Sequence, residues 1–181
     1  MEYSSKKITL VNSINGFTLV ELIVTLAVGA ILLTIVIPSF TVLFQNSQIL
    51  TQRQSLQTTI AFSRDEAVRR STPVSVCGSS NQTVCDGSWQ NGWIVFTDSD
   101  KNGVRKLGER ILQVSEAVLP NTLKYINQNN KNYVSFDSLG FLQKQLAGTF
   151  IFCDSRSGKN GIGININQNG RSQVVNKLVC P

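Results

Sequence analysis

The sequence contains no histidine, and this absence removes several classes of function at once. Without an imidazole there is no histidine-based catalytic triad, no histidine metal ligand and no histidine acid–base catalyst. The four cysteines include no pair separated by two residues, which argues against a zinc site or a thioredoxin-like redox centre. No nucleophile–base pair stands out among the remaining residues, so the sequence does not predict an enzyme.

Charge is missing from one long stretch near the start of the chain. Apart from Glu21, residues 17–37 are uncharged and almost entirely apolar. As a helix they would rise about 31 Å, enough to cross a hydrocarbon core of about 30 Å. A carboxylate in hydrocarbon costs about 3 kcal/mol on insertion scales, so Glu21 needs a partner or a function. The sequence therefore predicts a transmembrane helix over 17–37 with one acid near its start.

A short polar leader, residues 1–16, precedes this segment and carries Lys6 and Lys7. Positively charged flanks stay on the cytoplasmic side, so the rest of the chain is expected to be translocated. In an ordinary secretory signal the apolar region lies before the cleavage site and is lost with it. A cut after Gly16 would instead leave the apolar segment in the mature chain.

Gly16 followed by the residues FTLVE resembles the processing site of type IV pilins and type II secretion pseudopilins. In that family a prepilin peptidase cuts after the glycine and methylates the new N-terminus, here Phe17. The resemblance places an acid at the fifth mature position, Glu21, and a helix-bending proline at the twenty-second, Pro38. It implies that the Phe17 amine of one subunit meets the Glu21 carboxylate of its neighbour in a filament. A generic single-pass anchor, with Glu21 reaching the membrane interface, is the alternative.

The helix is expected to continue outside the membrane over residues 38–72, because apolar residues recur at helical spacing up to Pro73. Its charged end, residues 64–70, is expected to be a solvated face with local ion pairs. From residue 73 to 181 the pattern changes to short β-like runs bounded by Asn, Asp, Gly and Ser. The eight candidate strands are 74–77, 92–97, 110–114, 122–126, 133–136, 149–153, 161–165 and 173–175.

Many short strands after one long helix predict an α+β protein, with the C-terminal half of the helix packed on an antiparallel β-sheet head. The family resemblance implies that this is the type IV pilin fold. Because the head would be exported to an oxidising compartment, its even number of cysteines predicts two disulfides. Three pairings are possible, and we favour Cys77–Cys85 with Cys153–Cys180; free cysteines are the alternative.

Two further stretches narrow the resemblance. Residues 61–74 (AFSRDEAVRRSTPV) and 92–98 (GWIVFTD), with ERIL at 109–112, are similar to the GspH/FimT family of minor pilins and pseudopilins. This implies a structural subunit that primes or caps type IV pilus assembly at the inner membrane or the pilus tip. A minor pseudopilin of the type II secretion system is an alternative.

The same resemblance implies where such a subunit is found and what it meets. It would be a single-pass inner-membrane protein with a periplasmic head, later part of a pilus on the surface of a Gram-negative bacterium. Its partners would be other pilins and minor pilins in the filament, the prepilin peptidase and the inner membrane.

The exported part of the chain is basic. The net charge of the whole chain is +6, and removing two lysines and one glutamate with the leader leaves +5. Some FimT-like relatives bind DNA through a Gly-Arg-x-Arg pattern, of which residues 170–173 (GRSQ) keep only the first arginine. Double-stranded DNA binding is therefore a hypothesis beside an ordinary basic surface. The candidate DNA-binding cations are Lys144, Arg156, Lys159, Arg171 and Lys177.

Residues 98–109 match the spacing of a calcium-binding loop. The side-chain oxygen donors would be Asp98, Asp100, Asn102 and Glu109. Lys101, Arg105 and Lys106 add opposing charge, and the flanks resemble strands rather than helices. A hairpin turn rich in Asp, Asn and Gly, with no cofactor, is the simpler interpretation, and we favour it over a Ca²⁺ site.

Overall fold

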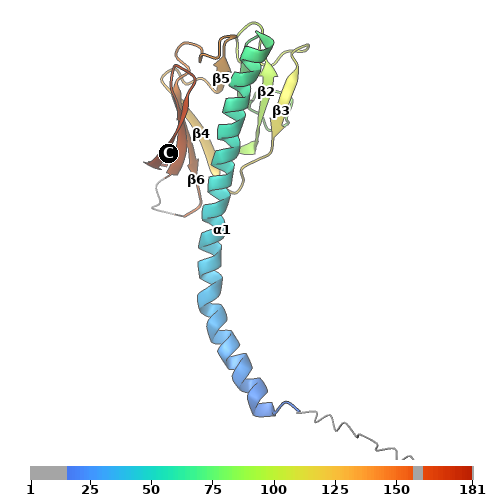
Figure 1. The fold of residues 1–181 in the computed structure, drawn as a ribbon, viewed down its shortest axis with the longest axis vertical. Helices are drawn as coiled ribbons and strands as arrows, with labels where there is room; N and C mark the ends of the chain where they lie inside the picture. Colours follow the sequence, from blue (N-terminus) through green and yellow to red (C-terminus); the bar gives the residue numbers. More distant parts are fainter. Residues whose placement is uncertain (1–15, 157–160, 181) are drawn as a thin grey trace, which may run out of the picture. The chain divides into compact units, whose positions relative to one another are not determined.

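The computed structural model describes residues 16–156 and 161–180 (Figure 1). One long helix, α1 (Leu19–Arg70), comes first, and a short 3₁₀ helix, η1 (Trp89–Asn91), lies between the first two strands. The strands are β1 (Val74–Gly78), β2 (Trp93–Thr97), β3 (Ile111–Ser115), β4 (Thr122–Asn127), β5 (Tyr133–Phe136), β6 (Gly148–Cys153), β7 (Gly161–Ile166) and β8 (Ser172–Leu178). All eight candidate strands are confirmed, and the largest difference is at β8, which ends three residues later than expected.

The chain forms two compact units, residues 1–43 and 44–181, whose border lies inside α1. In the first unit α1 begins after Thr18, whose hydroxyl accepts a 3.2 Å hydrogen bond from the Glu21 amide. This is an N-cap, and it satisfies one of the amides that a helix start leaves without a partner. Glu21 lies in the first turn, where the positive end of the helix dipole favours a carboxylate.

At its other end, in the second unit, α1 stops in a Schellman motif. Ser71 has a left-handed backbone with φ of 49°, and its amide donates to the Val68 carbonyl. The amide of Thr72 reaches back to the Ala67 carbonyl at 3.2 Å. These bonds use the last carbonyls of the helix, and Pro73 cannot continue it.

The charged end of α1 is more buried than the sequence indicates. Glu66 is buried and pairs with both Arg69 and Arg70. The local ion pairs are therefore present, but the expected solvated face is wrong for this glutamate. A buried carboxylate needs such partners, because removing one of them leaves a charge without compensation.

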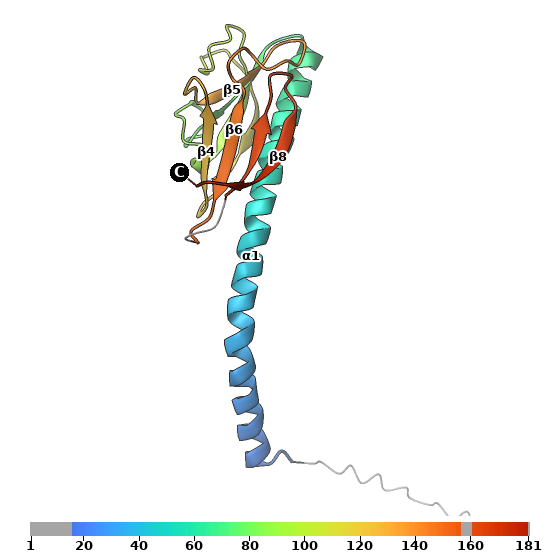
Figure 2. The same cartoon turned by 90° about the vertical axis from the view of Figure 1, so that its left-hand side faces the viewer.

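The head in the second unit has two antiparallel sheets, each with four strands (Figure 2). One sheet has the order β3-β2-β1-β5 and the other the order β4-β6-β7-β8. The chain leaves the first sheet after β3, forms β4 in the second, and returns so that β5 pairs with β1. One core cluster contains side chains from both sheets and from the second half of α1.

Helix and sheets meet through large apolar side chains. Leu56 and Ile60 of α1 are fully buried in this core. The ring of Phe150 on β6 stacks on Tyr125 with centroids 4.3 Å apart and meets Trp89 edge-on at 4.7 Å. Burying side chains of this size contributes about 1.5–3 kcal/mol each. The burial of Leu56 and Ile60 in this core therefore holds the second half of α1 on the head.

Both disulfides of the favoured pairing are present, and the described residues include no free cysteine. Cys77–Cys85 closes a short loop after β1. Cys153–Cys180 returns the chain after β8 to the end of β6, although β7 lies between these strands. Gly161, the first residue of β7, leaves room beside this crossing, because a Cβ there would lie 3.1 Å from the Cys153 sulfur.

Candidate functional site

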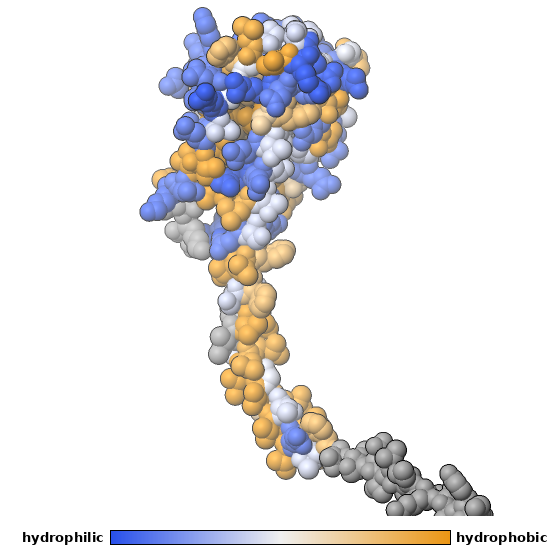
Figure 3. Space-filling model, viewed as in Figure 1, coloured by the Kyte–Doolittle hydropathy of each residue, from blue (hydrophilic) through white to orange (hydrophobic). Residues whose placement is uncertain are grey.

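The first half of α1 carries the apolar segment, and α1 is long and apolar enough to cross a membrane by length and composition. None of its most apolar window is buried, and Figure 3 shows apolar side chains all along this part. The hydroxyls of Thr25 and Thr34 donate to the carbonyls of Leu22 and Ile31 at 2.9 and 2.7 Å. These two polar groups are therefore satisfied within the helix itself.

The carboxylate of Glu21 differs from the two threonine hydroxyls in its interactions. It has no ion-pair partner among the residues that the structure describes, and it carries the only charge of the segment 17–37. Gly16 and Phe17, at the expected processing site, precede the helix, and Phe17 is exposed. Pro38 lies inside α1, and leader residues 1–15 are outside the described part of the chain.

The structure brings three of the four expected metal ligands together in the loop between β2 and β3. Carboxylate oxygens of Asp98, Asp100 and Glu109 lie within 4.8 Å of one another. The side-chain oxygen of the fourth, Asn102, accepts a hydrogen bond from the Val104 amide at 2.7 Å. The loop thus has the donor set that a cation such as Ca²⁺ prefers.

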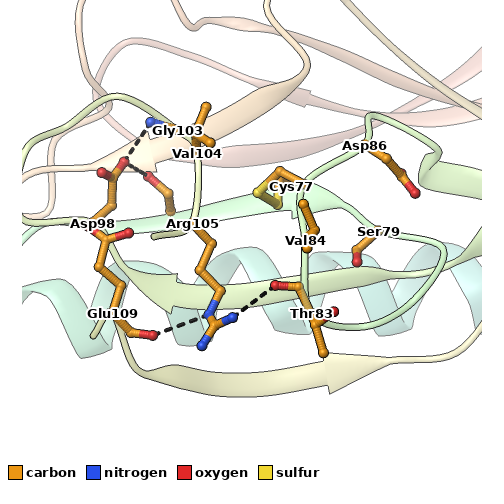
Figure 4. Close-up of a disulfide and its surroundings, with 12 residues drawn as sticks. Cys77, Ser79, Thr83, Val84, Asp86, Asp98, Gly103, Val104, Arg105 and Glu109 are labelled. Atoms are coloured by element: carbon orange, nitrogen blue, oxygen red, sulfur yellow. Dashed lines mark hydrogen bonds between the residues drawn. A yellow bond between two sulfur atoms is a disulfide. The ribbon is translucent and has the colours of Figure 1, made fainter. Parts of the chain in front are cut away.

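Hydrogen bonds from the chain already occupy these carboxylates, and Figure 4 shows the one from Gly103 to Asp98. The amide of Gly103 donates to buried Asp98 at 2.9 Å, and the amide of Lys106 donates to Glu109 at 2.8 Å. The ammonium of Lys106 bonds to Asp100 and lowers the pKa of that carboxyl. The same contacts stabilise a turn without any ion, as the hairpin interpretation requires.

Arg105 joins this loop to the disulfide loop that follows β1. Its Nε donates to the Glu109 carbonyl at 3.2 Å, and a terminal nitrogen donates to the Thr83 carbonyl at 3.1 Å (Figure 4). From the sequence, Arg105 is only a charge that opposes cation binding. The structure gives it a different role as the link between two loops.

The five candidate DNA-binding cations are not equally available. Lys144, Arg171 and Lys177 are exposed, on the segment before β6, in the β7–β8 turn and on β8. Arg156 is engaged by Asp154, and Lys159 is outside the described residues. Arg171 and Lys177 lie near opposite ends of β8, about 20 Å apart along an extended chain.

A cleft between α1 and the β7–β8 turn was not expected from the sequence. It has a volume of about 290 Å³ and places Arg64 beside Arg171, with Asp65 also in its lining. The two arginines are far apart in the sequence, and only the packing of the head on α1 brings them together. The local charge pattern carries no signal for this pairing.

A long helix with an apolar first half, followed by a head of two antiparallel sheets, defines a pilin-like subunit. The family model described as type II transport protein GspH matches residues 52–170, and the prokaryotic N-terminal methylation motif matches residues 12–37. The chain belongs to the GspH family. It is a structural pilin subunit and not an enzyme.

Solved structures agree with this fold. The type IV minor pilin FimU of Pseudomonas aeruginosa is 20% identical, with a TM-score of 0.55, over 72% of this chain and 90% of that chain. A second crystal form of FimU is 21% identical, with a TM-score of 0.53, and the match covers 70% of this chain and 91% of that chain. The minor pseudopilin EpsH from the type 2 secretion system of Vibrio cholerae is 10% identical, with a TM-score of 0.51. This match covers 71% of this chain and 97% of that chain.

At these identities the similarity shows the fold, which is the α+β type IV pilin fold. No curated protein matches the sequence. Family and fold together identify a membrane-anchored minor pilin or pseudopilin, of a type IV pilus or a type II secretion system, that assembles with other pilins in a filament.

Proposed function

We propose that this chain is a minor type IV pilin that primes or caps pilus assembly from the inner membrane. The observation that carries this proposal is the carboxylate of Glu21, which has no cationic partner among the described residues of its own chain. A carboxylate in hydrocarbon is costly, and a cation from a second subunit would remove that cost. Assembly in register is then favoured over the isolated membrane-bound state.

Processing supplies the cation. The prepilin peptidase cuts between Gly16 and Phe17 and methylates the new amine of Phe17, and the non-helical, exposed chain at this point supports access. The amine of one subunit then meets Glu21 of its neighbour. Pro38, which lacks an amide hydrogen, provides a point at which α1 can bend as the subunit enters the filament.

This role sets the location of each part. The first half of α1 spans the inner membrane once, and the head stays in the periplasm until assembly. The subunit then becomes part of a pilus at the surface of a Gram-negative bacterium. Its partners are other pilins and minor pilins.

The test is the Glu21→Ala variant of the full-length chain. It should enter the membrane fraction normally, because it only removes a charge from an apolar helix, and its amount in sheared filaments should fall at least tenfold. Thr25→Val is the matched control, since its hydroxyl bonds within the helix and its loss should leave incorporation unchanged. Normal incorporation of Glu21→Ala would refute the pairing.

A pseudopilin of a type II secretion system is the alternative within the same family, and the EpsH likeness is compatible with it. Deleting the gene separates the two roles. Loss of surface pili with normal protein secretion supports the pilus role. Loss of secretion with normal pili supports the pseudopilin role.

DNA binding during uptake is a second candidate, supported by the exposed cations Lys144, Arg171 and Lys177. Three phosphate contacts would give a slope of about −2.7 for the logarithm of the binding constant against the logarithm of salt concentration. A gel shift of the detergent-solubilised chain with duplex DNA across a salt series measures this slope. Arg171→Ala should make this slope less steep, at about −1.8, because one phosphate contact is lost. No shift at low salt would reject DNA binding.

A further inference from the structure

Three segments of the head meet at Gly140, in the turn formed by residues 137–141 after β5. The Nε of Arg64 on α1 donates to the Gly140 carbonyl at 2.9 Å. The β7–β8 turn approaches the same carbonyl, because a Cβ at Gly170 would lie 2.7 Å from it. Gly140 has φ of 79° and Gly170 has φ of 73°, a conformation that glycine adopts without strain.

Arg64 and Gly170, which meet at this junction, also line the cleft between α1 and the β7–β8 turn. Arg64 and Arg171 line the cleft together with Asp65, Ile60 and Ala61. Arg64 uses Nε for the turn, and its terminal nitrogens have no hydrogen-bond acceptor among the described residues. No described residue accepts a hydrogen bond from the Arg171 guanidinium either, and this side chain is exposed.

Apolar side chains surround the same junction. Leu139 and Phe141, on either side of Gly140, are 72% and 49% exposed, and Val68 of α1 is 50% exposed. The turn is well fixed, because the amides of Leu139 and Phe141 both donate to Oδ1 of Asp137 at 3.0 and 2.9 Å. These side chains therefore form a preorganised edge rather than the tip of a loose loop.

We propose that this surface, made of the Arg64–Arg171 cleft and the apolar edge Val68, Leu139 and Phe141, docks the head of another pilin subunit whose contacting surface is acidic. A carboxylate of that subunit enters the cleft between the two guanidinium groups, and its apolar neighbours pack on Leu139 and Phe141. Arginine and aromatic side chains together are typical of the centre of protein interfaces, and arginine binds carboxylates in a fixed, planar geometry. The inference rests on the proposed role in a filament and adds the place and chemistry of one contact.

The exposed apolar edge beside the cleft favours a protein partner over a nucleic acid. The exposed Leu139 and Phe141 contribute nothing to phosphate contacts, which rest on cations and hydrogen-bond donors.

The charges select against a second copy of this chain. The mature chain carries a net +5, so two copies repel at long range, whereas an acidic head is attracted. A pilin of opposite head charge is therefore the fitting neighbour.

The test places a photo-crosslinking amino acid at Leu139 or at Phe141 of the full-length chain in piliated cells. Leu107 in the β2–β3 loop is the control position, because it is fully exposed and belongs to a different surface. We expect adducts from positions 139 and 141, identified by peptide mass as a pilin with an acidic head, and none with that pilin from position 107. Adding Arg171→Glu should lower the adduct yield at least tenfold, and Arg171→Lys should retain part of it.

Several outcomes would overturn the docking surface: adducts with nucleic acid, adducts only with the same chain, equal adducts from position 107, or no adduct. Counting surface pili in the same strains separates this failure from that of the proposed function. Normal incorporation without adducts at 139 and 141 refutes the surface alone. A chain that never enters filaments, in cells whose pili do not depend on it, refutes the proposed function.

Discussion

The hydroxyl of Ser75 donates a 2.6 Å hydrogen bond to Oδ2 of Asp98, and both residues are buried. The same carboxylate accepts hydrogen bonds from the amides of Asn102 at 3.1 Å and Gly103 at 2.9 Å. Asp98 therefore ties β1 to the loop that follows β2. The bonds to this side chain help to fix how the β2–β3 loop leaves the sheet.

Replacing Asp98 with alanine should destabilise the head by about 3 kcal/mol. The change leaves a buried hydroxyl and two amides without their acceptor, and hydrogen bonds to charged groups are the stronger ones. Urea unfolding of the detergent-solubilised chain measures the effect. Asp100→Ala is the control, since its ion pair with Lys106 is exposed to solvent and should contribute much less. Equal losses in the two variants would contradict the role given to Asp98.

Calcium should not raise the melting temperature. An ion in the β2–β3 loop would have to displace the Lys106 ammonium from Asp100 and compete with the amides that donate to Asp98. The measurement compares thermal unfolding in millimolar calcium with unfolding in excess chelator. A calcium-dependent rise that Glu109→Gln abolishes would instead establish a metal site at Asp98, Asp100 and Glu109.

The free energy of unfolding should decrease in acid, and protonation of Asp86 in the disulfide loop should cause part of this decrease. Burial opposes the shift, but hydrogen bonds from the hydroxyl and amide of Ser80 and from the amide of Ser88 lower the Asp86 pKa from 3.8 to about 2. A depressed carboxyl pKa stabilises the folded state above about pH 4, and this contribution is lost as the pH falls towards 2.

Asp86→Asn should therefore lower the melting temperature at neutral pH and reduce its decline between pH 4 and 2. The effect should stay below about 1 kcal/mol, because Asp86 is exposed and solvent screens it. Asp65→Asn, at another exposed site, is the control for the change in net charge. If the melting temperatures of wild type and Asp86→Asn fell in parallel between pH 4 and 2, the role given to Asp86 would be contradicted.

The two disulfides should contribute unequally. Cys153–Cys180 joins residues 27 apart and Cys77–Cys85 joins residues 8 apart. On the chain-entropy account, loss of the longer loop costs about 3.5 kcal/mol and loss of the shorter one about 2.5 kcal/mol. Double serine variants of each pair, compared by urea unfolding under oxidising conditions, measure this order. A larger loss for the shorter loop would show that strain or contacts outweigh loop entropy.

Local patterns were sufficient to predict α1 and the eight strands, although not the short helix η1. Short apolar runs bounded by turn residues identify each strand, and Pro73 marks the end of the helix, because these signals depend on near neighbours. The partition of the strands between two sheets was not predictable in this way. β5 pairs with β1 rather than with β4, which directly precedes it, and this choice depends on packing across the whole head.

The same distinction between local pattern and tertiary packing applies to the candidate sites. The segment from Gly16 to Glu21 is a contiguous motif, so its spacing alone indicates processing and assembly. Arg64 and Arg171 come from α1 and the β7–β8 turn, and their proximity exists only after both sheets have packed on the helix. Burial of Glu66 in a charged run is a tertiary effect of the same kind.

Because Arg105 hydrogen-bonds to carbonyls of Thr83 and Glu109, it holds the disulfide loop and the β2–β3 loop together as one surface. Antibodies raised against the folded head at this place should recognise both loops together. A linear peptide copied from either loop alone would lack half of that epitope and should compete poorly for such antibodies.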